Sequence, residues 1–457
     1  MEDMTKGSPL RQILRFAFPV LLANLCQQAY RIADAAVVGR YLGKEALSSV
    51  VGASETLLFI SISFFLGLSY GMPIITGQCF GAKDYINVRR SIGLSVLVIS
   101  GLALPLMLTA GFSTEWMLHL MNTPENLVSG AASYMKVLFF TGVINVLLLL
   151  LISVIRVLGD SMAALFIMVC SCVLNIGLNV LFVAVFGWGI PGVAWATVTA
   201  QFIPLVLGVI YFCWKMPQFV PHFADLKWGW NFIWQHLRVA IPAGFQNVVV
   251  AFGTVIVQYA VNSLGEDAVG GISATAALGG LVYMPLFAIA AALSTFCAQN
   301  FGAQNLRRII VGVRRTAVII MVYVAVSTIL VWIFAPFLAT IFLPETAENA
   351  ETIRYGIRFL RLLSPFYVVL GFLFICSPPL TGMGYPKAPF WSGIMEMIMR
   401  CACALVLTKF IGFDGACLAH PVAWFGAAVI VVPDYLRKIR KLKRDGIPVR
   451  IERATEL

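Results

Sequence analysis

Residues Ile92–Phe112 read IGLSVLVISGLALPLMLTAGF, 21 consecutive residues without a charged side chain. A helix rises about 1.5 Å per residue, so a run of this length can cross the roughly 30 Å of hydrocarbon in a bilayer. Similar runs recur along the chain, for example at Val137–Ile155 and Val318–Phe334. A strand of a membrane barrel needs only about half this length and alternates polar with apolar residues, which these runs do not. The sequence therefore predicts an all-α membrane protein.

The composition agrees with this class. Hydrophobic residues make up 60% of the chain and charged residues only 12%, whereas soluble domains carry about 25% charged residues. The ten cysteines include no C-x-x-C pair, so we expect neither a zinc site nor a disulfide framework. The four histidines include no H-E-x-x-H motif, which speaks against an intramembrane enzyme. We expect no cofactor.

Positive charge predicts the orientation of twelve helices. Of the 32 Lys and Arg residues, 23 fall in the two termini and in every second loop, and only seven fall in the opposite loops. Cytoplasmic segments are enriched in Lys and Arg, so both termini are expected in the cytoplasm. The first residues lack an A-x-A-like cleavage site, so no cleavable signal is expected. The expected helices are 13–38, 46–80, 88–112, 129–157, 162–186, 190–214, 236–262, 270–298, 308–338, 355–380, 388–410 and 414–434.

The chain contains an internal repeat. QILRFAFP at Gln12–Pro19 aligns with QHLRVAIP at Gln235–Pro242, an offset of 223 residues, and GQCFGAKD aligns downstream with AQNFGAQN at Ala298–Asn305. Each half holds six helices, an even number, so the two bundles are expected to be related by a pseudo-twofold axis along the membrane normal, as in transporters. The expected domains are an N-terminal lobe (1–215), a cytoplasmic linker (216–235), a C-terminal lobe (236–435) and a basic cytoplasmic tail (436–457).

Four polar residues are predicted at one depth in the outer half of the first lobe. Asp34 lies about 8 Å from the outer end of its helix, and Asn179 and Thr197 lie about 10–12 Å from theirs. Asn175 and Asn179 are spaced i, i+4 and share a helix face. A carboxylate in hydrocarbon costs at least roughly 2.5–3.5 kcal/mol, so Asp34 is a functional candidate. The plainer alternative for Asp34 is a buried acid that pairs with Arg31, three residues earlier. For the other three residues it is helix–helix hydrogen bonding.

The segment MTKGSPLRQILRFAFPVLLANLCQQAYRIADAAVVGRYLG at Met4–Gly43 resembles the first helix of the multidrug and toxic compound extrusion (MATE) family, and SVIRVLGDS, LNIGLN and GVAWAT are similar to later family segments. The details look closest to the branch containing DNA-damage-inducible protein F. The resemblance implies a monomeric antiporter of the bacterial inner membrane. It would export amphipathic, often cationic, organic compounds in exchange for H⁺ or Na⁺ by alternating access.

The resemblance also implies roles for the intramembrane polar residues. Asp34 matches the family's coupling aspartate, Asn175 and Asn179 match its N-x-x-x-D pair, and Thr197 matches a helix 6 threonine. The second position of the pair is Asn179 instead of aspartate. A single carboxylate makes a weaker Na⁺ site, so H⁺ coupling is slightly favoured, although Na⁺ at these four residues stays open.

Two further charge pairs are expected inside the membrane. Arg31 and Glu55 fall at similar depths in adjacent helices and are expected to neutralise each other; alternatively, Glu55 attracts cationic substrates. Glu396 and Arg400 are spaced i, i+4 and are expected to pair. The residues expected to line a substrate cleft are Arg31, Glu55, Met72, Gln246 and Met284.

One rival within transport is a flippase for lipid-linked substrates, which shares the same general fold. It should present a strongly cationic cleft, but the two intramembrane arginines both have acidic neighbours. The net charge of +11 needs no nucleic acid, because it follows from the topology. The expected partners are therefore small organic substrates and membrane lipids.

Overall fold

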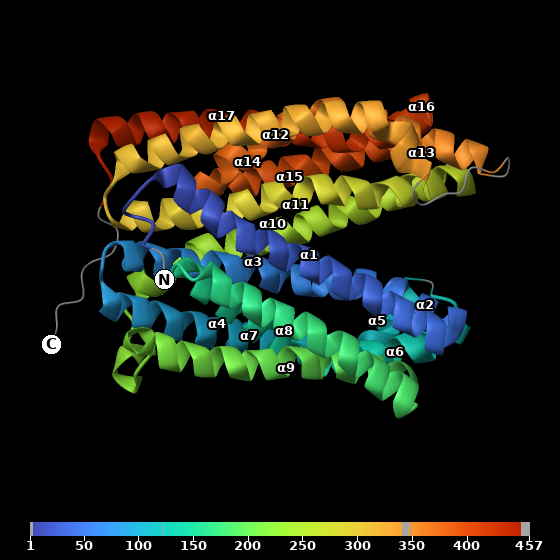
Figure 1. Ribbon diagram of the computed structural model, residues 1–457, viewed down its shortest axis with the longest axis horizontal. Coiled ribbons are helices and arrows are strands. Elements are labelled where there is room, and N and C mark those ends of the chain that lie inside the picture. Colours follow the sequence, from blue (N-terminus) through green and yellow to red (C-terminus); the bar gives the residue numbers. More distant parts are fainter. Residues whose placement is uncertain (1–2, 122, 341–345, 347–348, 449–457) are drawn as a thin grey trace. The chain divides into compact units, whose positions relative to one another are not determined.

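The computed structural model describes residues 3–121, 123–340, 346 and 349–448. All regular elements within this part are helices, which confirms the all-α prediction (Figure 1). The last nine residues of the expected basic tail lie outside the described part. The chain divides into two compact units. The first contains Phe18–Gly244, and the second contains Thr5–Ala17 and residues 245–448.

Two long helices contribute to both units. The first residues of α1 (Pro9–Tyr41) belong to the second unit and the remainder to the first, whereas α10 (Trp230–Asn262) begins in the first unit and ends in the second. The other helices of the first unit are α2 (Gly43–Val51), α3 (Ala53–Gly81), α4 (Tyr85–Phe112), α5 (Thr114–Leu120), α6 (Glu125–Phe140), α7 (Gly142–Val157), α8 (Ser161–Asn179), η1 (Val180–Val185) and α9 (Gly189–Lys215).

The second unit contains the remaining helices of the chain. They are α11 (Glu266–Gly302), α12 (Leu306–Thr340), α13 (Ala350–Leu363), η4 (Ser364–Phe366), α14 (Tyr367–Gly382), α15 (Lys387–Ala402), η5 (Cys403–Leu407), α16 (Thr408–Ile411) and α17 (Phe413–Asp445). The expected linker lies within the first unit and contains two short 3-10 turns, η2 (Pro217–Phe219) and η3 (Phe223–Leu226).

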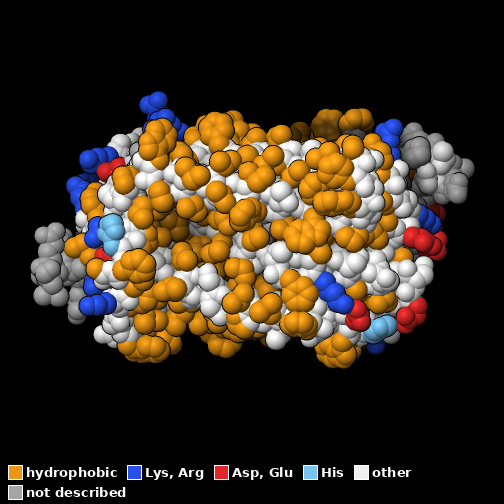
Figure 2. All heavy atoms as spheres, turned by 90° about the horizontal axis from the view of Figure 1, so that it is seen from below, with side chains coloured by type: hydrophobic (Ala, Val, Ile, Leu, Met, Phe, Trp, Pro, Cys, Tyr) orange, Lys and Arg blue, Asp and Glu red, His pale blue; other side chains and the backbone are white. Residues whose placement is uncertain are grey.

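Nine helical segments in the described residues are long and apolar enough to cross a membrane, and the pair α6–α7, bent by 52°, makes a tenth. Two more continuous helical stretches have spanning length: α1, which carries Arg31 and Asp34, and the run from α15 to α16, which carries Glu396 and Arg400. Their charges lower their hydropathy. The total agrees with the twelve expected spans. Figure 2 shows hydrophobic side chains over the middle of the helices and charged ones near their ends.

The linker is held against α4 by polar contacts. Arg89 Nε donates to Asp225 Oδ2 at 2.9 Å, and Trp228 Nε1 donates to the backbone oxygen of Arg90 at 3.0 Å. Burial would raise the pKa of the Asp225 carboxyl, but the bonds from Arg89 and from the backbone N–H of His222 outweigh it, so the pKa is lowered. The linker is thereby fixed on the first unit.

Gly382→Ala is expected to destabilise the protein. A Cβ at this position would lie 2.3 Å from the backbone oxygen of Ser294, so α14 and α11 would have to move apart. Overpacking of this kind costs about 1–3 kcal/mol. The measurement is thermal unfolding of the purified protein in detergent. The matched control is Gly101→Ala in α4, where nothing lies within 4 Å of the added Cβ, and where helix propensity predicts a small gain. Equal melting temperatures for the two variants would contradict the expectation.

Candidate cation-coupling site

Asp34 on α1 meets the two asparagines of α8. Asn179 Nδ2 donates to Asp34 Oδ1 at 2.5 Å and to Asn175 Oδ1 at 2.9 Å. Asn175 and Asn179 are 0% and 1% exposed. Their i, i+4 spacing stacks the two amides, so the end of the amide chain reaches the carboxylate. Three of the four predicted site residues are thus directly linked.

Helix α9 completes the network with Thr197. Asn175 Nδ2 donates to Thr197 Oγ1 at 3.4 Å, and the Tyr30 hydroxyl donates to the same oxygen at 3.4 Å. Tyr30 was not among the residues predicted from sequence. The available signal was its position four residues before Asp34, which places both side chains on one face of α1. Tyr134 on α6, also not predicted, is buried within electrostatic reach of Asp34.

Side-chain bonds to backbone oxygens hold the three helices together. Ser171 Oγ donates to the carbonyl of Ala200 at 2.7 Å, which ties α8 to α9, and Cys172 Sγ donates to the carbonyl of Cys26 at 3.3 Å, which ties α8 to α1. Asn179 is the last residue of α8, and the π-helical segment η1 follows it. Single π-helical turns inside helices occur frequently at functional sites.

One buried oxygen of the network has no partner. Asn179 Oδ1 is buried and accepts no hydrogen bond. A buried acceptor of this kind costs about 1–3 kcal/mol unless it is satisfied. A protonated Asp34 could donate to it, and a bound Na⁺ could take it as a ligand together with the carboxylate and Thr197 Oγ1. The described residues contain no group of three or more His, Cys, Asp and Glu side chains that could hold a metal ion. Asp34 is therefore a single carboxylate among neutral oxygens.

Arg31 and Glu55 lie beside this network. Arg31 Nη1 is 3.9 Å from Glu55 Oε1, and both side chains are more than half exposed. Such a loose, exposed pair contributes little to stability. Glu55 also lies within electrostatic reach of Asp34.

The remaining residues expected in a substrate cleft have different surroundings. Met72 is fully buried inside the first unit. Gln246 and Met284 in the second unit are partly exposed. Gln246 packs against Gly393 of α15, where an added Cβ would lie 2.8 Å from Gln246 Cγ.

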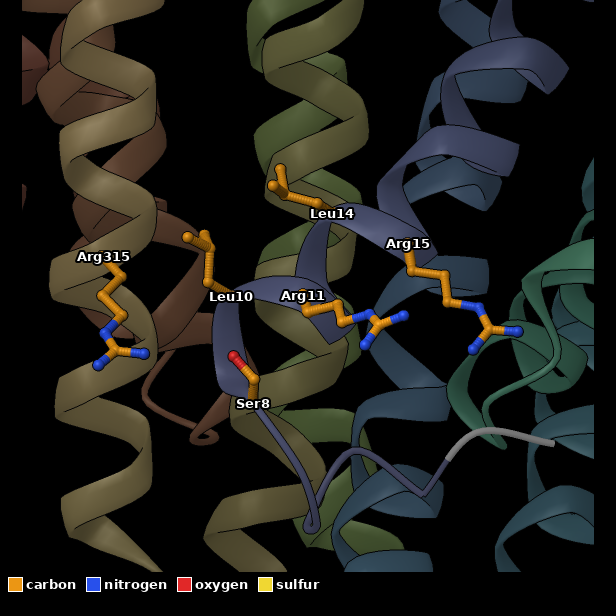
Figure 3. A pocket seen from close by; sticks show the side chains of 6 residues that line it. All are labelled: Ser8, Leu10, Arg11, Leu14, Arg15 and Arg315. Carbon is orange, nitrogen blue, oxygen red and sulfur yellow. The ribbon is translucent and has the colours of Figure 1, made fainter.

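A separate depression of about 600 Å³ lies at the start of α1 and beside α12, in the second unit (Figure 3). Arg11 and Arg15 extend from α1 and Arg315 extends from α12, with Leu10 and Leu14 between them. The depression combines positive charge with apolar side chains and shares no residue with the Asp34 network.

The MatE family model matches the chain twice, at residues 19–181 and 242–406. The two matches begin at Pro19 and Pro242, which the internal repeat pairs. Together they cover more than half of the chain, and residues 182–241 between them include α9 and the expected linker.

Similar proteins and structures agree with this match. The chain is 29% identical over 379 residues to the probable multidrug resistance protein YpnP of Bacillus subtilis, covering 82% of this chain and 83% of the relative. It is 24% identical to DNA damage-inducible protein F of Escherichia coli over 44% of this chain and 43% of the relative. A multidrug resistance MATE transporter solved in an outward-facing conformation superposes with a TM-score of 0.88 at 21% identity, over 96% of this chain and 98% of that one. The chain therefore belongs to the multidrug and toxic compound extrusion family of membrane transporters.

Proposed function

We propose that this protein is a secondary active multidrug antiporter that exports amphipathic, often cationic, organic compounds in exchange for a cation. The observation that carries the proposal is the Asp34 network, a lone carboxylate bonded to buried amides inside a membrane helix. An intramembrane carboxylate costs free energy and is retained where it serves transport. Relatives named as multidrug resistance proteins support the substrate class.

In this mechanism, the charge of Asp34 is the variable that the transported cation changes. A proton on Asp34 would turn the carboxyl into a donor, and the unpaired Asn179 Oδ1 is the acceptor available to it. Proton binding to Asp34 therefore removes a charge and adds a hydrogen bond between α1 and α8. A coupling ion acts by differential interaction with two conformations, and this change supplies such a difference.

The chemistry of the network favours H⁺ over Na⁺. Na⁺ sites use several oxygen ligands and gain from negative charge, and here Asn179 stands where the family pattern has a second carboxylate. Two of the neutral oxygens, Asn175 Oδ1 and Thr197 Oγ1, already accept hydrogen bonds. Proton exchange needs no further ligand.

The proposed location is the bacterial inner membrane with both termini in the cytoplasm, where Arg11, Arg15 and Arg315 would face anionic lipid headgroups. Cations near such a surface gain about 1 kcal/mol each. Membrane lipids and small organic substrates are therefore the proposed partners.

Proteoliposomes with an imposed gradient test the coupling. A pH gradient, acidic on the side that receives the substrate, is expected to drive ethidium transport, and a Na⁺ gradient at equal pH is expected to drive little. Transport that responds to Na⁺ alone would contradict H⁺ coupling, and transport that ignores both gradients would contradict antiport.

The variant Asn179→Asp tests ion choice in the same assay. It introduces the second carboxylate of the family pattern and is expected to increase ethidium transport driven by a Na⁺ gradient, relative to the unmodified protein. Asn175→Asp, one turn away on the same helix, is the matched variant that adds the same charge to the network at a different place.

A further inference from the structure

The internal repeat pairs the helices of the candidate site with helices of the second unit. The repeat pairs α8 with α15 and the start of α9 with the start of α17. Both α8 and α15 run into a π-helical segment, η1 and η5. The local helix distortion is thus repeated in the two halves, which agrees with the pairing of the two helices.

At the depth of Asp34, the second unit is apolar. The counterpart of Asp34 lies near Val257, and the positions 223–225 residues after Asn179 are Ala402, Cys403 and Ala404. Val257 is buried in an apolar cluster whose other buried members are Ala260, Val261, Cys403, Ala404, Ala416 and Ala419. Among the described residues, this cluster contains no carboxylate that could exchange a cation.

Arg400 and Glu396, two and six residues before Ala402 on α15, form a polar pair instead. Arg400 is 5% exposed, and its Nη2 is bonded to Glu396. The Arg400 side chain runs along Gly253, where an added Cβ would lie 3.4 Å from Arg400 Cδ. Gly253 has no side chain, which leaves room on α10 for the Arg400 side chain.

Titratable side chains of three neighbouring helices lie near the Glu396–Arg400 pair. On α15 itself, Glu396 is bonded to Arg400. From α17, His420 lies within electrostatic reach of Arg400, and His420 is the counterpart of Thr197. From α11 and α14, Tyr283 and Tyr367 adjoin the cluster. Residues 245–262 of α10 contribute no charged side chain.

Arginine does not lose its proton in proteins. The Glu396 carboxylate, which is bonded to an arginine, therefore already holds a cation, and that cation is covalently attached to the protein. We propose that Arg400 is a tethered cation that occupies the second lobe's counterpart of the coupling site, so that Glu396 exchanges no ion during transport. The first lobe then binds an exchangeable cation at Asp34, and the second lobe keeps a permanent one.

The proposal is tested first by stability, which does not depend on transport. Arg400→Gln leaves Glu396, whose side chain is 17% exposed, without a countercharge. Partial burial favours its protonated form, so stability is retained at low pH and is lost as the pH rises. One proton bound only in the folded state changes the unfolding equilibrium constant by about tenfold per pH unit. We expect this added pH dependence in Arg400→Gln and its disappearance in the double variant Glu396→Gln/Arg400→Gln.

Arg31→Gln is the matched control, because it removes an arginine from a pair in which Glu55 is more than half exposed. It should add little pH dependence. Equal pH dependence in Arg400→Gln and in the double variant would overturn the proposal, since Glu396 would then not depend on Arg400 for its charge.

The second experiment measures how many cations are exchanged per substrate, and it rests on the proposed antiport. In proteoliposomes, this number follows from the cation gradient at which net substrate transport changes direction. We expect one cation per substrate for the unmodified protein and the same value for Glu396→Gln/Arg400→Gln. Two cations for the unmodified protein and one for the double variant would make Glu396 an exchanging site and would refute the tethered cation. Absence of any coupled cation would refute the antiport while leaving the stability result intact.

Discussion

Asp34→Asn is expected to reduce drug export to the level of cells without the transporter, while the protein still folds and reaches the membrane. The asparagine side chain has nearly the same shape and keeps an oxygen that can accept the 2.5 Å bond from Asn179 Nδ2. It cannot change its charge, so the event that would distinguish the loaded from the unloaded lobe is removed. Ethidium efflux from cells that overproduce the variant measures the effect.

The control for this variant is Glu45→Gln. It removes an exposed carboxylate from the first turn of α2, outside the Asp34 network and the expected substrate cleft. We expect Glu45→Gln to retain substantial export. Full export by Asp34→Asn, at an expression level equal to that of the unmodified protein, would contradict the coupling role.

The positions of Asp34, Asn175, Asn179 and Thr197 could be predicted because helix geometry is regular. A fixed rise per residue places residues at equal distances from the helix ends at one depth. The contact between the asparagines follows from their i, i+4 spacing. Which atoms pair could not be predicted, because the chain of bonds from Thr197 to Asp34 depends on the rotation of three helices about their axes.

Tyr30 was missed because tyrosine is ordinary in a membrane protein, where its ring packs and its hydroxyl finds a partner. Nothing about its residue type distinguishes it from other tyrosines in the chain. Its position one turn before Asp34 becomes informative only when α9 is known to lie opposite. The network therefore shows a limit of reasoning from a single helix at a time.

Helix breaks were also only partly predictable. The expected helix 129–157 is two helices that meet at Thr141 with a 52° bend, and its threonine hydroxyl donates to the carbonyl of Val137 at 2.6 Å. Side-chain bonds of this kind bend helices, but most threonines in helices make them without a break. At the other end of the chain, α17 continues to Asp445 instead of stopping near residue 434, because the basic run that follows consists mostly of good helix formers.

Arg308→Ala is expected to cause a large loss of stability in the second unit, because this side chain fixes the segment that precedes α1. Its guanidinium donates to the backbone oxygens of Gly7 and Lys6 at 2.5 and 2.6 Å and to Gln12 Oε1 at 2.6 Å. It also lies 5.6 Å from the centre of the Phe296 ring. Hydrogen bonds from a charged donor contribute about 1.5–3 kcal/mol each, and they are not additive. A loss of about 3 kcal/mol is therefore a reasonable expectation.

Limited proteolysis and thermal unfolding together measure this effect. The released segment of Arg308→Ala should be cleaved before α1 at protease concentrations that leave the unmodified protein whole, and the melting temperature should fall. The matched control is Arg307→Ala, which removes an exposed arginine from the adjacent position of α12. Because both variants lose one positive charge from the same helix end, a difference between them isolates the hydrogen bonds. If Arg307→Ala were cleaved as readily, the charge of this helix end, and not the three bonds of Arg308, would hold the segment in place.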